Sequence, residues 1–144
     1  MLGVELLLAS RALFDELHRR LAAAGHEGLR PAHGFLLQAV GDGGAGASEV
    51  AARLGVTKQA ARLMIEELLA AGYVEPSEAP GDARRRPVRP SARGREVLRR
   101  SEEIFDALRD ELAAQVGPET LASGLRLLGA IENRYGPVPL RPVW

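Results

Sequence analysis

Three hydrogen-bond donors lie close together near the middle of the sequence. Lys58, Gln59 and Arg62 stand at the start of the stretch TKQAARLMIEELLAAGYV, and Glu66 and Glu67 follow them. Ammonium, carboxamide and guanidinium groups at helical spacing are suited to hydrogen bonds with base edges and phosphates in a major groove. The two glutamates would repel phosphates, so only the first two helical turns suit such a contact. The pattern predicts a helix that enters a groove with its N-terminal residues first.

A run of arginines further along the chain supplies a second cationic group. Arg84, Arg85 and Arg86 follow Asp82 in a segment rich in turn-forming residues. Residues 81–100 hold eight Arg and two acidic residues, a local net charge of +6, so the remainder of this formally neutral chain carries −6. A solvated surface loop is the plainer interpretation of the run. Its position directly after the donor-bearing helix favours contact with a DNA backbone or minor groove.

The donors need a scaffold, and the residues around them predict a helix-turn-helix. Ser48 is a suitable N-cap for a first helix, Gly55 suits a turn with positive φ, and Thr57 suits the cap of the second helix. The apolar positions of the second helix share one stripe, which turns the donors outward. These apolar positions are Ala61, Met64, Ile65 and Leu68. A helical hairpin packed for stability alone is the alternative. The residues of this segment predicted to contact DNA are Thr57, Lys58, Gln59, Ala60 and Arg62.

The segment after the recognition helix predicts a β-hairpin with a basic tip, a wing. Gly72 is a suitable C′ residue for the helix, and residues 76–85 are rich in turn formers between two extended stretches. Pro87 and Pro90 lack an N–H, so the pairing of the hairpin should be weakened or confined to an edge of the sheet. The wing residues predicted to contact DNA are Asp82, Arg84, Arg85 and Arg86.

Amphipathic helices are predicted on both sides of this winged segment. Residues 4–24 form the first, whose apolar stripe packs either on its own chain or on a second copy of it. Pro31 suits the first turn of the next helix. Residues 91–115, capped by Ser91, and residues 118–135 predict two more. The inward positions predicted for the last helix are Leu121, Leu125, Leu128 and Ile131.

Composition excludes several classes of protein. The chain has 144 residues, no Cys and a formal net charge of zero. This length suits one ordinary domain, or a small domain with helical extensions. Without Cys the chain has no disulfide, no thiolate metal site and no thiol redox chemistry. The apolar start, Met1 to Ala9, is too short for a membrane span and lacks a basic n-region, so a soluble, cytoplasmic protein without a membrane partner is expected.

Catalytic and metal-binding patterns are weak. His18, His26 and His33 lie eight and seven residues apart with no accompanying carboxylate cluster, which favours ordinary core or surface histidines over a metal site. Residues 43–46 are glycine-rich, but no Lys-Ser/Thr follows them as in a phosphate-binding loop. No nucleophile and base stand in a recognisable arrangement. We therefore expect neither enzymatic activity nor a cofactor.

Taken together, the residues resemble the MarR family of winged-helix transcription regulators over roughly residues 30 to 135. The matching stretches are SEVAARLGVTKQA, AAGYVE and PGDARRRPVRPSARGRE. The Asp-x-Arg of the family's wing falls on Asp82 and Arg84, and the Gly-Arg that opens the next helix falls on Gly94 and Arg95. The sequence departs from the family's usual residues at Ala61, Arg62, Leu63, Ala83, Pro87 and Pro90.

The resemblance implies a mainly α fold with a small β-hairpin. Residues 31–90 would form the winged helix-turn-helix domain, and residues 1–30 and 91–144 the helical dimerisation region. It implies a homodimer that binds double-stranded DNA, acting as a ligand-responsive repressor on a pseudo-palindromic operator. A winged-helix protein-interaction module with weak or lost DNA binding is the alternative, because of the prolines in the wing and the neutral net charge.

The resemblance also implies a small aromatic or anionic effector, held between the dimer helices and the winged domain. Candidate ligand-binding residues are Arg11, Phe14, His18 and His33. Ordinary core or surface placement of these four side chains is the alternative. The proline-rich tail, residues 136–144, is consistent both with an extended arm anchored by Trp144 and with a disordered end.

Overall fold

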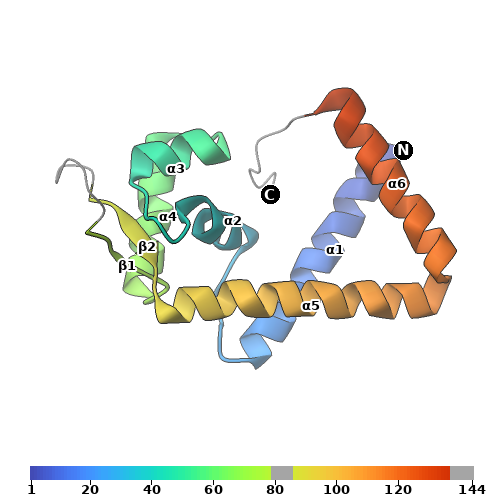
Figure 1. Ribbon diagram of the computed structural model, residues 1–144, viewed down its shortest axis with the longest axis horizontal. Helices are drawn as coiled ribbons and strands as arrows, with labels where there is room; N and C mark the ends of the chain where they lie inside the picture. The colour runs from blue at the N-terminus through green and yellow to red at the C-terminus, as the bar shows by residue number, and fades with distance from the viewer. Residues whose placement is uncertain (79–85, 137–144) are drawn as a thin grey trace.

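The structure is a computed structural model, which describes residues 1–78 and 86–136. Its helices are α1 (Leu2–Ala23), α2 (Pro31–Val40), α3 (Ala47–Leu54), α4 (Lys58–Ala70), α5 (Ala92–Val116) and α6 (Pro118–Tyr135), and its strands are β1 (Val74–Pro76) and β2 (Val88–Pro90). Figure 1 shows α2, α3, α4 and the hairpin gathered at one end of α5, with α6 at its other end. The predicted fold class, mainly α with a small β-hairpin, is confirmed.

The core of the winged part lies where α2, α3 and α4 face one another. Leu36, Leu37 and Val50 are completely buried there, and Ala61 and Leu68 meet them from α4. Burying a Leu or Val side chain contributes about 1.5–3 kcal/mol, so this cluster fixes the angle between the helices of the helix-turn-helix. The predicted inner stripe of α4 is confirmed, and its opposite face is left to solvent.

The turn between α3 and α4 follows the sequence signals at its centre. Gly55 adopts the left-handed conformation with φ 65°, and the N–H of Val56 donates to the carbonyl of Ala51 at 3.1 Å. The predicted cap at Ser48 is wrong, because α3 begins earlier, with Gly46 as N-cap and no side-chain cap. The Gly46 carbonyl already accepts the first helical bond, from the N–H of Val50 at 3.0 Å. Ser48 therefore lies inside the first turn and is exposed.

The sheet is short, and its prolines occupy positions that cost it little. β1 and β2 pair antiparallel with Val74 opposite Pro90. The N–H of Ser91 donates to Tyr73 and the N–H of Ser77 to Pro87, so by alternation the nitrogen of Pro90 faces away from β1. Only Pro87 removes a ladder bond.

β2 also contacts a backbone segment on the side away from β1, over a single residue pair. Ala45 pairs with its other side, where the N–H groups of Ala45 and Val88 donate to each other's carbonyls at 2.9 and 3.0 Å. The backbone of Ala45 therefore replaces a third strand, and it holds β2 between itself and β1.

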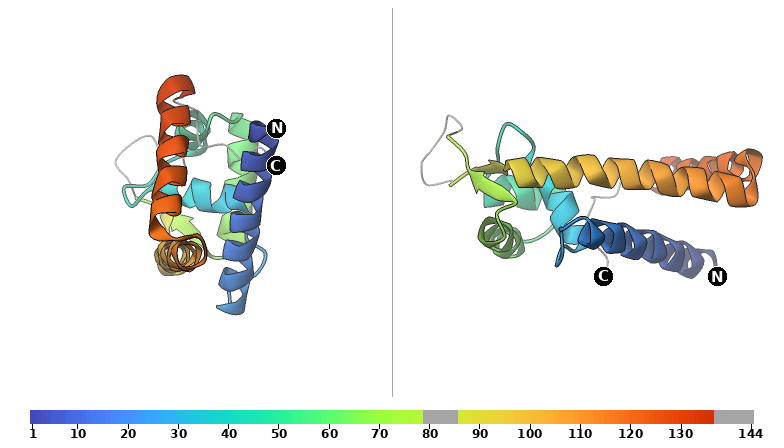
Figure 2. Two further views of the ribbon diagram at one scale, coloured as in Figure 1. Left: turned by 90° about the vertical axis from the view of Figure 1, so that its right-hand side faces the viewer. Right: turned by 90° about the horizontal axis from the view of Figure 1, so that it is seen from below.

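Helices α1, α5 and α6 form an open arrangement away from the winged part (Figure 2). The C-terminal half of α1 packs on its own chain, where Leu17 and Leu21 join the core. Arg20 ties α1 to α5 through two hydrogen bonds to the Glu111 carboxylate, at 2.9 and 2.8 Å. Within the described residues, each helix is too short or too polar to cross a lipid bilayer.

Helix α6 departs from the predicted burial. All its 18 residues are described and none is buried. The predicted inward positions are half-buried at Leu121 and Ile131 and exposed at Leu125 and Leu128, because none of the described elements covers this face.

Candidate nucleic-acid interface and neighbouring pocket

The outward face of α4 carries the predicted DNA-contacting side chains. Thr57 Oγ1 accepts a hydrogen bond from the N–H of Ala60 at 3.1 Å, which fixes the first turn of the helix as predicted. Lys58, Gln59 and Arg62 are all exposed on the first two turns. The partial positive charge of a helix N-terminus adds to the attraction of these side chains for an anion.

A groove of about 570 Å³ lies between α4 and the hairpin, and cations surround it. Lys58 and Arg62 line it from α4, and Arg86 lines it from the residue before Pro87. The Nε–H of Arg62 donates to Glu66 Oε1 at 2.9 Å, which restrains the guanidinium and leaves its other N–H groups for a ligand. Three cations around one concave surface make this side of the molecule attractive to a polyanion.

The tip of the hairpin lies outside the described residues. This segment, residues 79–85, includes the predicted wing residues Asp82, Arg84 and Arg85. Arg86 is described and exposed, with a φ of 42° that is uncommon for a residue other than glycine. Of the predicted wing residues, the structure thus brings Arg86 next to the cations of α4.

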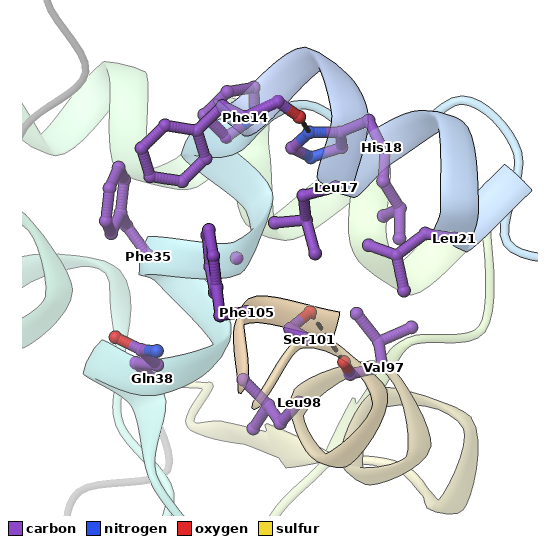
Figure 3. A pocket seen from close by; sticks show the side chains of 13 residues that line it. Phe14, Leu17, His18, Leu21, Phe35, Gln38, Val97, Leu98, Ser101 and Phe105 are labelled. Atoms are coloured by element: carbon purple, nitrogen blue, oxygen red, sulfur yellow. Dashed lines mark hydrogen bonds between the residues drawn. The ribbon is translucent and has the colours of Figure 1, made fainter. Parts of the chain in front are cut away.

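A second concave feature, the phenylalanine pocket, lies between α1, α2 and α5 (Figure 3). Its volume is about 80 Å³, and all three phenylalanines of the chain line it. The ring of Phe14 meets the rings of Phe35 and Phe105 at 5.7 Å between centroids, with interplanar angles of 64° and 87°. These edge-to-face contacts line the pocket with ring faces and edges, against which a flat, apolar ring packs well.

Three polar side chains also line the phenylalanine pocket. His18 Nδ1 donates to the carbonyl of Phe14 at 2.6 Å, so in the neutral ring Nε2 is the acceptor. Ser101 Oγ donates to the carbonyl of Val97 at 2.7 Å and keeps its lone pairs. Gln38 completes the polar lining, and neither Lys nor Arg is among the described residues around the pocket.

A family model described as the MarR family matches residues 27–85, from the segment before α2 to the residue before Arg86. A helix-turn-helix with a capped, donor-bearing second helix and a short antiparallel wing is the structure that this match requires. Over these residues the chain is similar to the MarR family.

Solved structures share this fold over most of the chain. RV1404 from Mycobacterium tuberculosis is similar at 24% identity and a TM-score of 0.75, covering 94% of this chain and 92% of that one. The repressor CouR, bound to a 23-mer DNA duplex, is similar at 23% identity and a TM-score of 0.66, covering 91% and 92%. The MarR family protein RV2887 from M. tuberculosis, in complex with salicylic acid, is similar at 24% and a TM-score of 0.63, covering 91% and 96%. No curated protein sequence matches the chain.

The structure separates the four ligand-binding candidates that the MarR-family resemblance suggested. Phe14 and His18 line the phenylalanine pocket. Arg11 is exposed on α1 and is not among the lining residues. His33 points to α4 instead, where its Nε2 donates to Glu67 Oε2 at 2.8 Å and its Nδ1 accepts from the N–H of Arg30 at 3.1 Å. The hydrogen bond from His33, together with one that the Arg30 guanidinium donates to the same Glu67 oxygen, lowers the pKa of the Glu67 carboxyl.

Sequence reasoning missed several residues of the phenylalanine pocket. Phe35 and Phe105 are visible in the sequence only as apolar positions of two helices, while Gln38 and Ser101 carry no local signal of any kind. A feature that would have drawn attention is the scarcity of phenylalanine, because each of the chain's three falls on a different predicted helix. Among the described residues, no three His, Asp or Glu side chains are placed to hold a metal ion.

Proposed function

We propose that this protein is a MarR-family, DNA-binding transcription regulator that acts as a ligand-responsive repressor, as a homodimer on a pseudo-palindromic operator. The observation that carries the proposal is the capped, exposed first half of α4, with Lys58, Gln59 and Arg62 beside Arg86 around one groove. These are donors suited to base edges and phosphates. CouR, which has the same fold, was solved on a DNA duplex and is a repressor.

Exposed apolar side chains on the terminal helices support the homodimer. Leu2, Val4, Leu7 and Leu8 of α1 are 45–59% exposed, and Leu125, Leu127 and Leu128 of α6 are 41–49% exposed. A monomer that left two such helices in water would expose a large apolar area, which usually marks an interface. We therefore assign residues 1–30 and 91–144 to dimerisation and residues 31–90 to the winged DNA-binding domain.

The lining of the phenylalanine pocket supports a small aromatic effector. Phe14, Phe35 and Phe105 offer ring edges and faces, while His18 Nε2 and Ser101 Oγ offer acceptors to a hydroxyl donor. Neither Lys nor Arg is among the described lining residues. This favours an uncharged aromatic effector over an anionic effector, which is the alternative. RV2887 was solved with salicylic acid, an aromatic carboxylic acid, which fits the aromatic character of the lining but also the anionic alternative. Because α1, α2 and α5 all border the pocket, a ligand there would bias the angle between the terminal helices and α4.

In vitro selection tests the DNA-binding proposal. The full chain is used to enrich a pool of duplexes with a randomised centre, and the bound sequences are read. We expect two inverted half-sites about one helical turn apart, as a dimer with two α4 helices requires. Enrichment of no sequence would contradict the proposal and would favour the protein-interaction alternative.

Three variants then separate base readout from phosphate contact. Arg62→Ala should reduce the binding free energy by about 1–3 kcal/mol and relax the sequence preference at particular base pairs. Arg86→Ala should weaken binding to all DNA sequences by the same factor. It should also reduce the slope of the logarithm of the binding constant against the logarithm of the salt concentration by about one. Arg109→Ala, which removes the same charge from an exposed position of α5, is the matched control. It should change neither the sequence preference nor the salt dependence of binding. If Arg62→Ala and Arg86→Ala altered the selected sequence in the same way, the assignment of α4 to the groove would be wrong.

A further inference from the structure

Leu63 is an apolar side chain in the middle of the polar, outward face of α4. It is 52% exposed, although leucine has no polar group to gain from water. At about 100° per residue it points away from the buried stripe of Ala61, Ile65 and Leu68. Gln59 lies one turn before it and Glu66 almost one turn after it on the same outward face. Nothing in the chain's described residues covers it.

The neighbours of Leu63 place it among the proposed base-reading donors. Gln59 and Arg62 stand four residues and one residue before it, and Glu66 holds the guanidinium of Arg62 at 2.9 Å. If the first two turns of α4 enter a major groove, Leu63 is pressed against the edges of the base pairs. The groove that Lys58, Arg62 and Arg86 line lies on the neighbouring side of α4 and does not include Leu63. Its cations indicate that this part of the helix meets a polyanion and not an apolar protein.

The chemistry of the major groove then narrows what Leu63 can contact. The C5-methyl of thymine is the apolar group that the four bases present there. Against thymine, leucine removes the C5-methyl from water. Cytosine has only a C5–H at this position, so the same contact buries less apolar surface. An apolar side chain at this position therefore discriminates between pyrimidines.

We propose that Leu63 is a specificity-determining residue that selects thymine through contact with its C5-methyl. This inference rests on the proposed DNA-binding function. Gln59 and Arg62 keep the hydrogen-bonding role, and Leu63 reads the methyl group alone. Burial of one methyl corresponds to about a fourfold gain in affinity. The family resemblance does not supply this role, since Leu63 is one of the positions where the sequence departs from the family's usual residues.

The experiment removes the methyl group from the DNA and the leucine from the protein in turn. Each thymine of the selected operator is replaced singly by deoxyuridine, which differs from thymine only in lacking that methyl. The affinity of the full chain is measured for every duplex, together with that of the Leu63→Ala and Leu69→Ala variants. Leu69 is the other exposed large apolar residue of α4, 37% exposed and six residues further along. Circular dichroism establishes that both variants keep the helix content of the parent chain.

We expect one thymine per half-site at which deoxyuridine weakens binding of the parent chain about fourfold. At that thymine Leu63→Ala should bind both duplexes alike, while Leu69→Ala should keep the fourfold difference, whatever its overall affinity. A cytosine placed there should bind more tightly as 5-methylcytosine. If Leu63→Ala kept the parent's response to deoxyuridine at every position, or if the parent chain responded nowhere, this inference would be overturned while the DNA-binding proposal stood. Failure of the parent chain to select any duplex would overturn both.

Discussion

Gly94 marks the closest approach between α5 and the start of the hairpin. A Cβ built on it would lie 2.0 Å from the carbonyl oxygen of Tyr73 and 3.2 Å from Leu37. Because the first contact is with backbone, the helix cannot accept a side chain there without moving away from the sheet. The Gly-Arg pair that resembles the MarR family's pattern thus has a steric cause in this chain.

We therefore predict that Gly94→Ala destabilises the fold by about 1–3 kcal/mol, the usual cost of overpacking. Gly124→Ala is the matched control, since a Cβ at this helical glycine meets nothing within 4 Å. It should stabilise α6 by about 0.5–1 kcal/mol, because alanine loses less entropy in a helix than glycine. Urea unfolding of both variants measures the difference. Equal effects of the two substitutions would mean that α5 does not pass Tyr73 this closely.

His26 is a buried titratable group at the joint between α1 and the winged part. Its Nδ1 lies 3.4 Å from the hydroxyl of Tyr73, to which Arg93 also donates at 3.2 Å. Burial, and then the positive charges of Arg93 and Arg100, lower the pKa of His26, against a smaller opposing effect of Glu96. The folded chain therefore binds this proton less well than the unfolded chain does.

The sign of the pH effect follows from that lowered pKa. The contribution of neutral His26 to stability is complete above the ordinary histidine pKa of about 6.5 and is lost as the pH falls below it. We predict that the free energy of unfolding decreases from about pH 7.5 to 5.5, and that His26→Gln removes part of this decrease. Urea titrations at a series of pH values measure it. An unchanged slope in the variant would show that His26 titrates alike in the folded and unfolded chains.

At the scale of helices and strands, the caps decide where each element begins. Thr57 accepts a bond from the N–H of Ala60, whereas Ser48 has no side-chain cap bond. Thr57→Ala should accordingly cost about 0.5–2 kcal/mol of stability and should also weaken DNA binding, since the first turn of α4 loses its anchor. Ser48→Ala should cost less than about 0.5 kcal/mol. Comparable losses from the two substitutions would restore Ser48 as the cap of α3.

Local signals explain why most elements were predictable. Pro31, Gly55, Thr57 and Ser91 each act on the backbone within four residues of themselves, and each marks a helix end or turn in the structure as predicted. The failure at Ser48 has a different cause. The start of α3 is set by the pairing of Ala45 with Val88, a contact between residues 43 positions apart that no local pattern encodes.

The same distinction applies to the candidate sites. The outward face of α4 was predictable because 3.6-residue periodicity assigns inside and outside within one helix. The phenylalanine pocket was not, since it joins three helices whose relative rotation depends on packing. Periodicity likewise could not direct His33 toward Glu67, which lies 34 residues further along. Sequence alone placed His18 and His33 in one candidate set, and the structure puts them in different environments.

At the scale of the whole molecule, the terminal helices leave apolar surface that a second copy would cover. We predict that the chain sediments at micromolar concentration at twice its mass of 15.4 kDa, with more than about 1,000 Å² buried between the copies. Leu128→Glu, which places a charge on the exposed stripe of α6, should shift the protein to the single-chain mass. Ala52→Glu, on the exposed face of α3, is the control and should remain a dimer. A parent chain that is cooperatively folded and sediments at the single-chain mass would contradict the homodimer.

Helix α5 is the element that joins the two ends of this molecule. It has 25 residues, and at 1.5 Å per residue it is about 37 Å long. Ser91 fastens one end to the wing through the bond from its hydroxyl to the carbonyl of Gly72 at 2.6 Å, and Gly117, with φ 88°, turns the other end into α6. Because α5 is long, a small rotation at one of its ends produces a large displacement at the other. A tilt of about 5° at the α6 end displaces the wing end by about 3 Å, comparable with the rise of about one base pair of DNA. A ligand far from α4 therefore needs to change only the angle at which α5 leaves the terminal helices in order to move a recognition helix out of register with its half-site.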